Sequence, residues 1–186
     1  MIKHVFIDFD GTLADTKLAN IDAYSAAFAK FGLPFSAKEY KKCFGLRFDD
    51  LCEHFNVPQE LRQQLKDQKK MEYAKRKWEV ELNESLVGLI RYWKRQGVTT
   101  TIVSTASKAN LEGILEYFDI VNLFDNVICG ESVKRGKPNP DAYFEALKLY
   151  KYPNPREVLV FEDSETGIKA AEAVGITNII KIGFYE

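Results

Sequence analysis

Short apolar runs alternate with longer segments of mixed polarity through most of the chain. The runs hold four to seven residues and are rich in β-branched and aromatic side chains, which is typical of buried strands. The first of them, KHVFIDF, leads into an Asp-Gly-Thr sequence. The predicted strands are Lys3–Phe9, Thr99–Val103, Asn126–Cys129, Val158–Phe161 and Asn178–Ile182.

The segments between these strands have the apolar spacing and the terminal Pro, Gly and acidic residues of helices. The predicted helices are Glu84–Gln96, Ser107–Phe118, Pro140–Tyr150 and Glu165–Val174. Because strand and helix alternate, the pattern favours an α/β fold: a Rossmann-like, parallel five-stranded sheet with helices on both faces.

One interval breaks the alternation. Between Asp8 and Ser104, at the ends of the first two strands, the chain is far longer than the ~30 residues of a simple βαβ unit. The excess is helical in pattern, over Leu18–Phe31, Lys38–Cys43, Phe48–Phe55 and Gln59–Trp78. We therefore predict an inserted helical domain at residues 16–82 and a core domain formed by residues 1–15 and 83–186.

Composition narrows the chemistry. Of 186 residues, 46% are hydrophobic and 28% charged, and the net charge of −1 provides no global field that would recruit nucleic acid or an anionic membrane. The three cysteines form no C-x-x-C pair, and two histidines are too few for a multi-histidine metal site. Without a signal-peptide pattern or an apolar run near ~18 residues, we expect a cytoplasmic protein whose chemistry depends on carboxylates.

An acid pair, Asp8 and Asp10, follows the first strand, at the sheet edge where open α/β folds bind ligands. A backbone turn at Gly11 lets both carboxylates serve one site, since glycine tolerates unusual backbone angles. One carboxylate can bind Mg²⁺ and attack phosphorus, and the other can donate a proton to the leaving oxygen and later accept one from water. The alternative is an Asp-rich turn without chemistry.

A second acidic pair, Glu162 and Asp163, follows the strand Val158–Phe161. A hard divalent cation needs several oxygen ligands, and these acids could complete its shell. Burial of acids at a strand end without a cation or a base would be costly. The alternative is that Asp163 or Ser164 only caps the following helix.

Two further loops carry groups suited to phosphate. Lys137, in Gly-Lys-Pro-Asn-Pro, could stabilise the equatorial oxygens of a transferring phosphoryl group, although an isolated lysine is commonly a solvated surface residue. Ser104 and Thr105 lie between a strand and a helix, where a hydroxyl and backbone amides suit a phosphate. The Gly130 to Gly136 segment is not a P-loop, because Pro138 replaces the required Ser or Thr.

The order acid pair, hydroxyl, lysine, acid pair resembles the haloacid dehalogenase-like hydrolase superfamily, in the branch with a helical cap after the first strand. The resemblance covers the whole chain. It implies the strand order 5-4-1-2-3. In this family the residue matching Asp8 forms an aspartyl-phosphate, the one matching Asp10 is the general acid/base, and those matching Ser104 and Lys137 hold the phosphoryl group.

The resemblance also implies a Mg²⁺ site. Its ligands would be the carboxylates matching Asp8 and Asp163 and the backbone carbonyl matching Asp10, with Glu162 supporting or sharing the ligation. The substrate contacts that we expect are at Gly11, Thr12, Arg47 and Thr105, with Arg47 on the cap loop facing a second phosphate or carboxylate of the substrate, or alternatively exposed at a helix start.

Details separate the relatives within the family. Carbon–halogen and phosphonate-cleaving members lack the second aspartate, which is present here as Asp10. The Glu-Asp-Ser-x-x-Gly run resembles β-phosphoglucomutases and many sugar phosphatases, whereas phosphoglycolate phosphatases usually carry an aspartate where this chain has Gly167. β-Phosphoglucomutases have a histidine at the position of Asn20 and an aliphatic residue at that of Thr12, so both departures favour hydrolysis.

We therefore expect a Mg²⁺-dependent phosphatase that acts on a small-molecule phosphate ester and has no nucleic-acid or membrane partner. Two alternatives remain at this point: a sugar-phosphate mutase that uses the same aspartyl-phosphate, and a non-catalytic binding module built on a hydrolase fold. The sequence identifies neither the substrate nor the oligomeric state.

Overall fold

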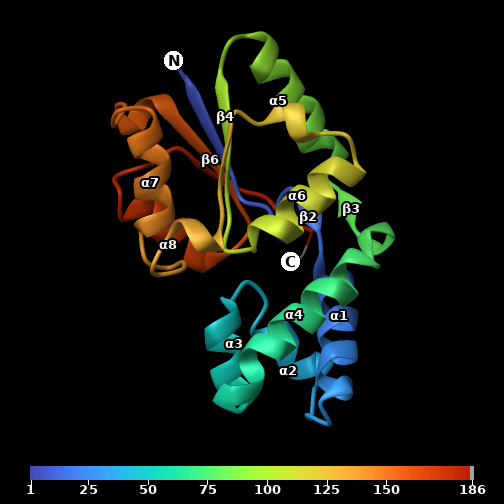
Figure 1. Ribbon diagram of the computed structural model, residues 1–186. Coiled ribbons are helices and arrows are strands. Elements are labelled where there is room, and N and C mark those ends of the chain that lie inside the picture. Colours follow the sequence, from blue (N-terminus) through green and yellow to red (C-terminus); the bar gives the residue numbers. More distant parts are fainter. Residues whose placement is uncertain (185–186) are drawn as a thin grey trace.

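The computed structural model describes residues 1–184 and contains an α/β body and a helical body (Figure 1). The strands are β1 (His4–Ile7), β2 (Ala14–Asp15), β3 (Glu81–Leu82), β4 (Thr99–Val103), β5 (Asn126–Ile128), β6 (Val158–Glu162) and β7 (Ile179–Lys181). The α-helices are α1 (Lys17–Lys30), α2 (Ala37–Lys42), α3 (Phe48–His54), α4 (Arg62–Ala74), α5 (Glu84–Arg95), α6 (Lys108–Tyr117), α7 (Asp141–Leu149) and α8 (Glu165–Glu172).

Within residues 1–184, β1 lies at the centre of a parallel five-stranded sheet of order β5-β4-β1-β6-β7. When only these five strands are numbered along the chain and the sheet is read from β7, this is the order 5-4-1-2-3. In register, Ile7 pairs with Ile102 of β4 and with Phe161 of β6. The carboxyl ends of β1, β4 and β6 therefore meet at one edge, where the residues that follow each strand come together.

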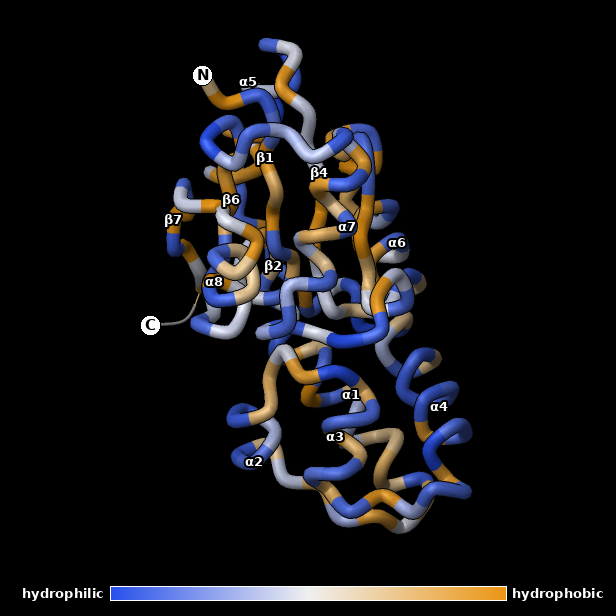
Figure 2. Tube along the Cα trace, turned by 90° about the vertical axis from the view of Figure 1, so that its left-hand side faces the viewer, coloured by the Kyte–Doolittle hydropathy of each residue, from blue (hydrophilic) through white to orange (hydrophobic). Residues whose placement is uncertain are grey.

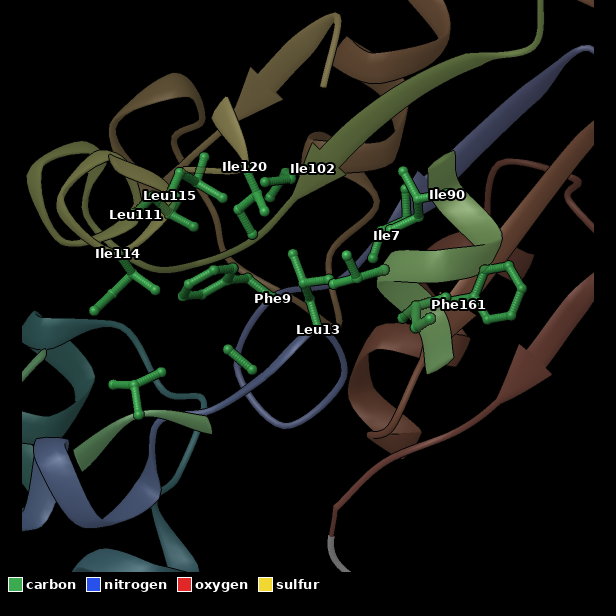
Figure 3. Packing of buried hydrophobic residues seen from close by; sticks show 14 of the residues in the cluster. Ile7, Phe9, Leu13, Ile90, Ile102, Leu111, Ile114, Leu115, Ile120 and Phe161 are labelled. Atoms are coloured by element: carbon green, nitrogen blue, oxygen red, sulfur yellow. The ribbon is translucent and has the colours of Figure 1, made fainter. Parts of the chain in front are cut away.

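Two hydrophobic layers sandwich the sheet, as the alternation of strand side chains requires. On one face, side chains of α5 and α6 pack against Ile7, Ile102 and Phe161, and Figure 3 shows Ile90, Leu111, Ile114 and Leu115 in this layer. On the other face, α7 and α8 cover Phe6, Val103 and Val160. Figure 2 shows the apolar character concentrated in the central strands, with polar stretches on the helices outside them.

Helices α1 to α4 form a body with an aromatic-rich core of its own, in which Tyr24, Phe28, Tyr40 and Leu65 are buried. This body is reached through β2 and β3, two-residue strands that pair antiparallel, with Ala14 opposite Leu82. The sequence did not predict this ribbon. The division at residues 15/16 and 82/83 stays a prediction, and the ribbon lies at those positions.

Most predicted elements match the observed ones to within a few residues, and one helix does not. The predicted helix Gln59–Trp78 is a 3₁₀ turn at Gln59–Leu61, helix α4, and a second 3₁₀ turn at Lys77–Glu79. None of the helices in residues 1–184 is long and apolar enough to cross a bilayer.

Candidate active site

The acid pair lies directly after the central strand. Asp8 still belongs to the extended ladder, because its backbone N–H donates to the carbonyl of Phe161 at 2.9 Å. The chain then turns at Gly11, whose φ of +95° is in the region that favours glycine, and the Gly11 N–H donates to the Ala14 carbonyl at 2.8 Å. The predicted turn at Gly11 is confirmed.

Lys137 joins the loop before α7 to the two neighbouring strand ends. Its Nζ lies 2.6 Å from Asp8 Oδ1 and also donates to Glu162 Oε1. Its side chain is only 5% exposed. Burial lowers the pKa of Lys137, but the charges of Asp8 and Glu162 outweigh it and hold the pKa well above the usual value. Lys137 is therefore a buried ammonium and not a solvated surface group.

Glu162 is fully buried and has partners for both of its oxygens. Oε1 accepts from Lys137, and Oε2 accepts from the backbone N–H and the hydroxyl of Ser164, each at 3.1 Å. Ser164 also caps α8, since its hydroxyl accepts from the Gly167 N–H at 3.0 Å. Ser164 thus caps the helix, as one interpretation of the sequence held, and also binds the buried carboxylate of Glu162.

Carboxylate oxygens of Asp8, Glu162 and Asp163 all lie within 4.8 Å of one another. Burial first, and the charge of Glu162 second, raise the pKa of Asp8 well above its usual value and that of Asp163 to about 6. A divalent cation would relieve this strain between acids, and hard oxygen donors suit Mg²⁺ or a similar ion. Because Glu162 is already occupied, Asp8 and Asp163 fit the ligand role best.

The side chain of Asp10 lies apart from that acidic group. Its Oδ1 accepts from the hydroxyl of Thr16, and Ser104 lies close enough to lower its pKa. Burial raises the pKa of Asp10, and the Thr16 bond partly opposes the shift. The hydroxyl of Ser104, almost fully buried after β4, accepts from the Ala106 N–H at 3.0 Å. The structure thus brings Ser104 next to the acid pair.

The four expected substrate contacts lie in different surroundings. Gly11 and Thr12 are outside the lining of a cavity between the two bodies, and the fully buried Thr12 hydroxyl instead donates to Asp163 Oδ1 at 3.4 Å. Thr105 and Arg47 do line the cavity, but both also link the helical body to the core. The Thr105 hydroxyl donates to the Gly45 carbonyl at 3.0 Å, and the Arg47 guanidinium donates to the Lys134 carbonyl.

A cavity of about 300 Å³ lies between the two bodies and reaches the acid pair at Asp10. Its helical side holds Lys69, which sequence reasoning missed. Lys69 is 8% exposed, its Nζ donates to Asn20 Oδ1 at 2.7 Å, and it lies 4.9 and 4.4 Å from the ring centres of Tyr24 and Tyr73. Burial lowers its pKa to about 8. Its i, i+4 spacing from Leu65 and Tyr73 was the available signal.

Comparisons with known proteins agree with this geometry. A family model described as haloacid dehalogenase-like hydrolase matches residues 5–181. A phosphorylated carbohydrates phosphatase from Thermotoga maritima is 25% identical over 96% of this chain and 84% of its own length. A bifunctional riboflavin kinase/FMN phosphatase from Arabidopsis thaliana is 30% identical over 96% of this chain, which spans 48% of that protein. The crystal structure of CbbY from Rhodobacter sphaeroides in complex with phosphate has a TM-score of 0.90 at 25% identity, covering 100% of this chain and 88% of that one.

Proposed function

The chain belongs to the haloacid dehalogenase-like hydrolase family, and from this premise we propose that it is a cytoplasmic, Mg²⁺-dependent phosphatase of small phosphorylated metabolites. The observation that carries the proposal is the contact of Lys137 with Asp8, 2.6 Å apart, at a sheet edge that also holds Asp10 and Asp163. A nucleophile, a fixed cation, a proton donor and a cation-binding acid are the groups that phosphoryl transfer needs.

In the proposed reaction, an Asp8 oxygen attacks phosphorus, and the P–O bond to the substrate alcohol breaks as Asp10 protonates the departing oxygen. Asp10, now ionised, takes a proton from water, which attacks the aspartyl-phosphate, releases inorganic phosphate and restores Asp8. The raised pKa of Asp10 favours its acid form in the first step. Lys137 and Ser104 would hold the phosphoryl oxygens throughout.

Mg²⁺ would be held by the carboxylates of Asp8 and Asp163 and the backbone carbonyl of Asp10. When bound, the ion supplies positive charge that keeps Asp8 ionised and reduces the repulsion between the Asp8 carboxylate and the phosphoryl oxygens. Glu162 would serve the site indirectly, because its oxygens orient Lys137 through a buried ion pair.

We assign the helical body the role of a cap that selects the substrate, and Lys69 the role of its main cation. Arg47, the residue that the sequence favoured, already donates to the Lys134 carbonyl. Lys69 is buried in the cavity wall, and no salt bridge joins it to a carboxylate within residues 1–184. A buried ammonium that feels the charge of Asp10 but contacts no carboxylate directly favours an anionic or oxygen-rich leaving group.

Asn20 supports hydrolysis over the mutase alternative. Its amide has no basic nitrogen, and its oxygen accepts the Lys69 hydrogen bond. No acid/base group therefore stands at this position to reserve the phospho-enzyme for a second sugar.

The experiment that tests the proposal is release of inorganic phosphate from a panel of sugar phosphates, sugar bisphosphates, phosphorylated acids and nucleotides, with Mg²⁺ and with EDTA. We expect Mg²⁺-dependent release that Asp8→Asn abolishes. Lys69→Met should lower kcat/KM for substrates with a second anion at least tenfold, whereas Lys75→Met, an exposed control, should not. No release from any ester by the folded, Mg²⁺-supplied protein would overturn the phosphatase.

A further inference from the structure

Tyr143 is a fully buried tyrosine beside the candidate active site. It belongs to the first turn of α7, is 0% exposed, and packs in the hydrophobic layer that contains Phe6 and Val160. Its ring centre lies 5.2 Å from the Nζ of Lys137. None of the motifs that pointed to the active site includes this residue.

The contact completes the enclosure of the Lys137 ammonium. Asp8 and Glu162 supply its charged acceptors, and the ring of Tyr143 lies against it with the electron-rich face that attracts a cation. A lysine side chain is a flexible four-carbon stem, so a single ion pair leaves its head free to pivot. A rigid, buried ring restricts that freedom.

The hydroxyl of Tyr143 lies close enough to Lys137 for the ammonium to lower its pKa, although burial raises that pKa overall. Within residues 1–184 this fully buried oxygen nevertheless makes no hydrogen bond of ordinary geometry. A buried polar group without a partner lowers stability, and a phenylalanine would avoid that cost. We therefore attribute the hold on Lys137 to the ring, and the comparison of Tyr143→Phe with Tyr143→Leu separates the ring from the hydroxyl.

We propose that Tyr143 is a positioning residue of the phosphoryl-transfer site, whose ring face holds the Lys137 ammonium against Asp8 and the transferring phosphoryl group. This inference rests on the proposed function, since it assigns Tyr143 a part in that reaction. Tyr143 touches Lys137 and not the substrate, so its effect on turnover passes through Lys137.

The test compares Tyr143→Phe, Tyr143→Leu and the control Phe6→Leu, a matched loss of a buried ring in the same layer. Each variant is assayed well below its melting temperature for kcat, for the Mg²⁺ concentration at half activity, and for affinity toward inorganic phosphate by calorimetry. We expect Tyr143→Leu to lose roughly tenfold in kcat and in phosphate affinity, with unchanged Mg²⁺ dependence. Tyr143→Phe should stay within about twofold of the wild type and melt at a higher temperature.

Phe6→Leu should lose stability as Tyr143→Leu does, while kcat and phosphate affinity remain. Folded Tyr143→Leu with wild-type kcat and phosphate affinity would overturn the inference. So would an equal loss in Tyr143→Phe, because the ring is intact there. If the wild type releases no phosphate from any ester, the proposed function fails, while phosphate affinity still reports whether Tyr143 orders Lys137.

Discussion

Replacement of glycine by alanine usually stabilises a helix. At Gly167 in α8, the same replacement should destabilise this protein. A Cβ atom built on Gly167 would lie 1.6 Å from Glu162 Oε1 and 2.0 Å from Glu162 Cδ, where real Cβ contacts essentially never fall below 3.0 Å. Gly167→Ala therefore forces the Glu162 carboxylate to move by more than an ångström. That movement breaks its bonds to Lys137 and Ser164.

Two effects of opposite sign decide the outcome. Alanine is favoured over glycine in a helix by about 1 kcal/mol. Disruption of a buried ion pair costs about 3–5 kcal/mol, because a charge is left without its partner. The second effect wins, and we expect a net loss of about 2–4 kcal/mol in the free energy of unfolding. For a chain of this size that corresponds to a melting temperature lower by roughly 5–15 °C.

Gly88→Ala in α5 is the matched control, because its Cβ would meet nothing within 4 Å. Thermal unfolding followed by circular dichroism should show Gly88→Ala as stable as the wild type or about 2–4 °C more stable. Phosphate release should fall strongly in Gly167→Ala and stay unchanged in Gly88→Ala. In a Glu162→Ala background, Gly167→Ala should no longer be costly, because the carboxylate it meets is absent.

The expectation is refuted if Gly167→Ala has the same melting temperature as Gly88→Ala and keeps full activity. Such a result would mean that Glu162 finds another position at no cost, and its buried bonds to Lys137 would then carry little energy.

Three further predictions follow from the site. Asp10→Asn should lose ~10²–10⁴ in rate on alkyl phosphates but much less on nitrophenyl phosphate, whose leaving group needs no proton; equal losses on both esters would contradict the role of Asp10. For substrates with a second anion, kcat/KM should decline above pH about 8, where Lys69 of the substrate-free enzyme loses its charge. Lys69→Arg should abolish this alkaline decline, because arginine stays charged. Gly136→Ala places a Cβ 2.7 Å from Arg47 Cδ, so it should raise KM several-fold, and an unchanged KM would show that the Arg47 contact does not matter for binding.

The sequence predicted which residues meet at the sheet edge because the topology itself brings them together. In a parallel sheet every strand ends at the same edge, so Asp8, Ser104 and Asp163 could be placed there from apolar runs alone. The turn at Gly11, directly after the acid pair, was equally accessible, since glycine tolerates unusual backbone angles. Lys137, by contrast, was a candidate in its local sequence with a solvated surface lysine as the alternative, and the family resemblance supported it, because nothing in that local sequence shows that it is buried.

The helical body was harder to interpret. The i, i+4 spacing of Leu65, Lys69 and Tyr73 indicates that α4 has a buried face. It does not show that this face lies opposite Asp10, because that depends on how the two bodies dock. The expectation for Arg47 had the same weakness. The need for glycine at position 167 could not be predicted from the sequence, because only the packing of Glu162 shows that a side chain does not fit there. An aspartate at this position, as in phosphoglycolate phosphatases, could not coexist with Glu162 in its present position.

The β2–β3 ribbon has a consequence for how such a protein can evolve. Ala14 and Leu82 lie opposite each other on paired strands although a long stretch of chain separates them, so the α/β body meets the helical insert as if it were a hairpin turn. The cost of closing a loop depends only weakly on its length. The helical body can therefore be lengthened, shortened or exchanged for another of different shape with little effect on the folding of the sheet. New substrate preferences can arise in the insert while the residues that we propose for phosphoryl transfer stay in place.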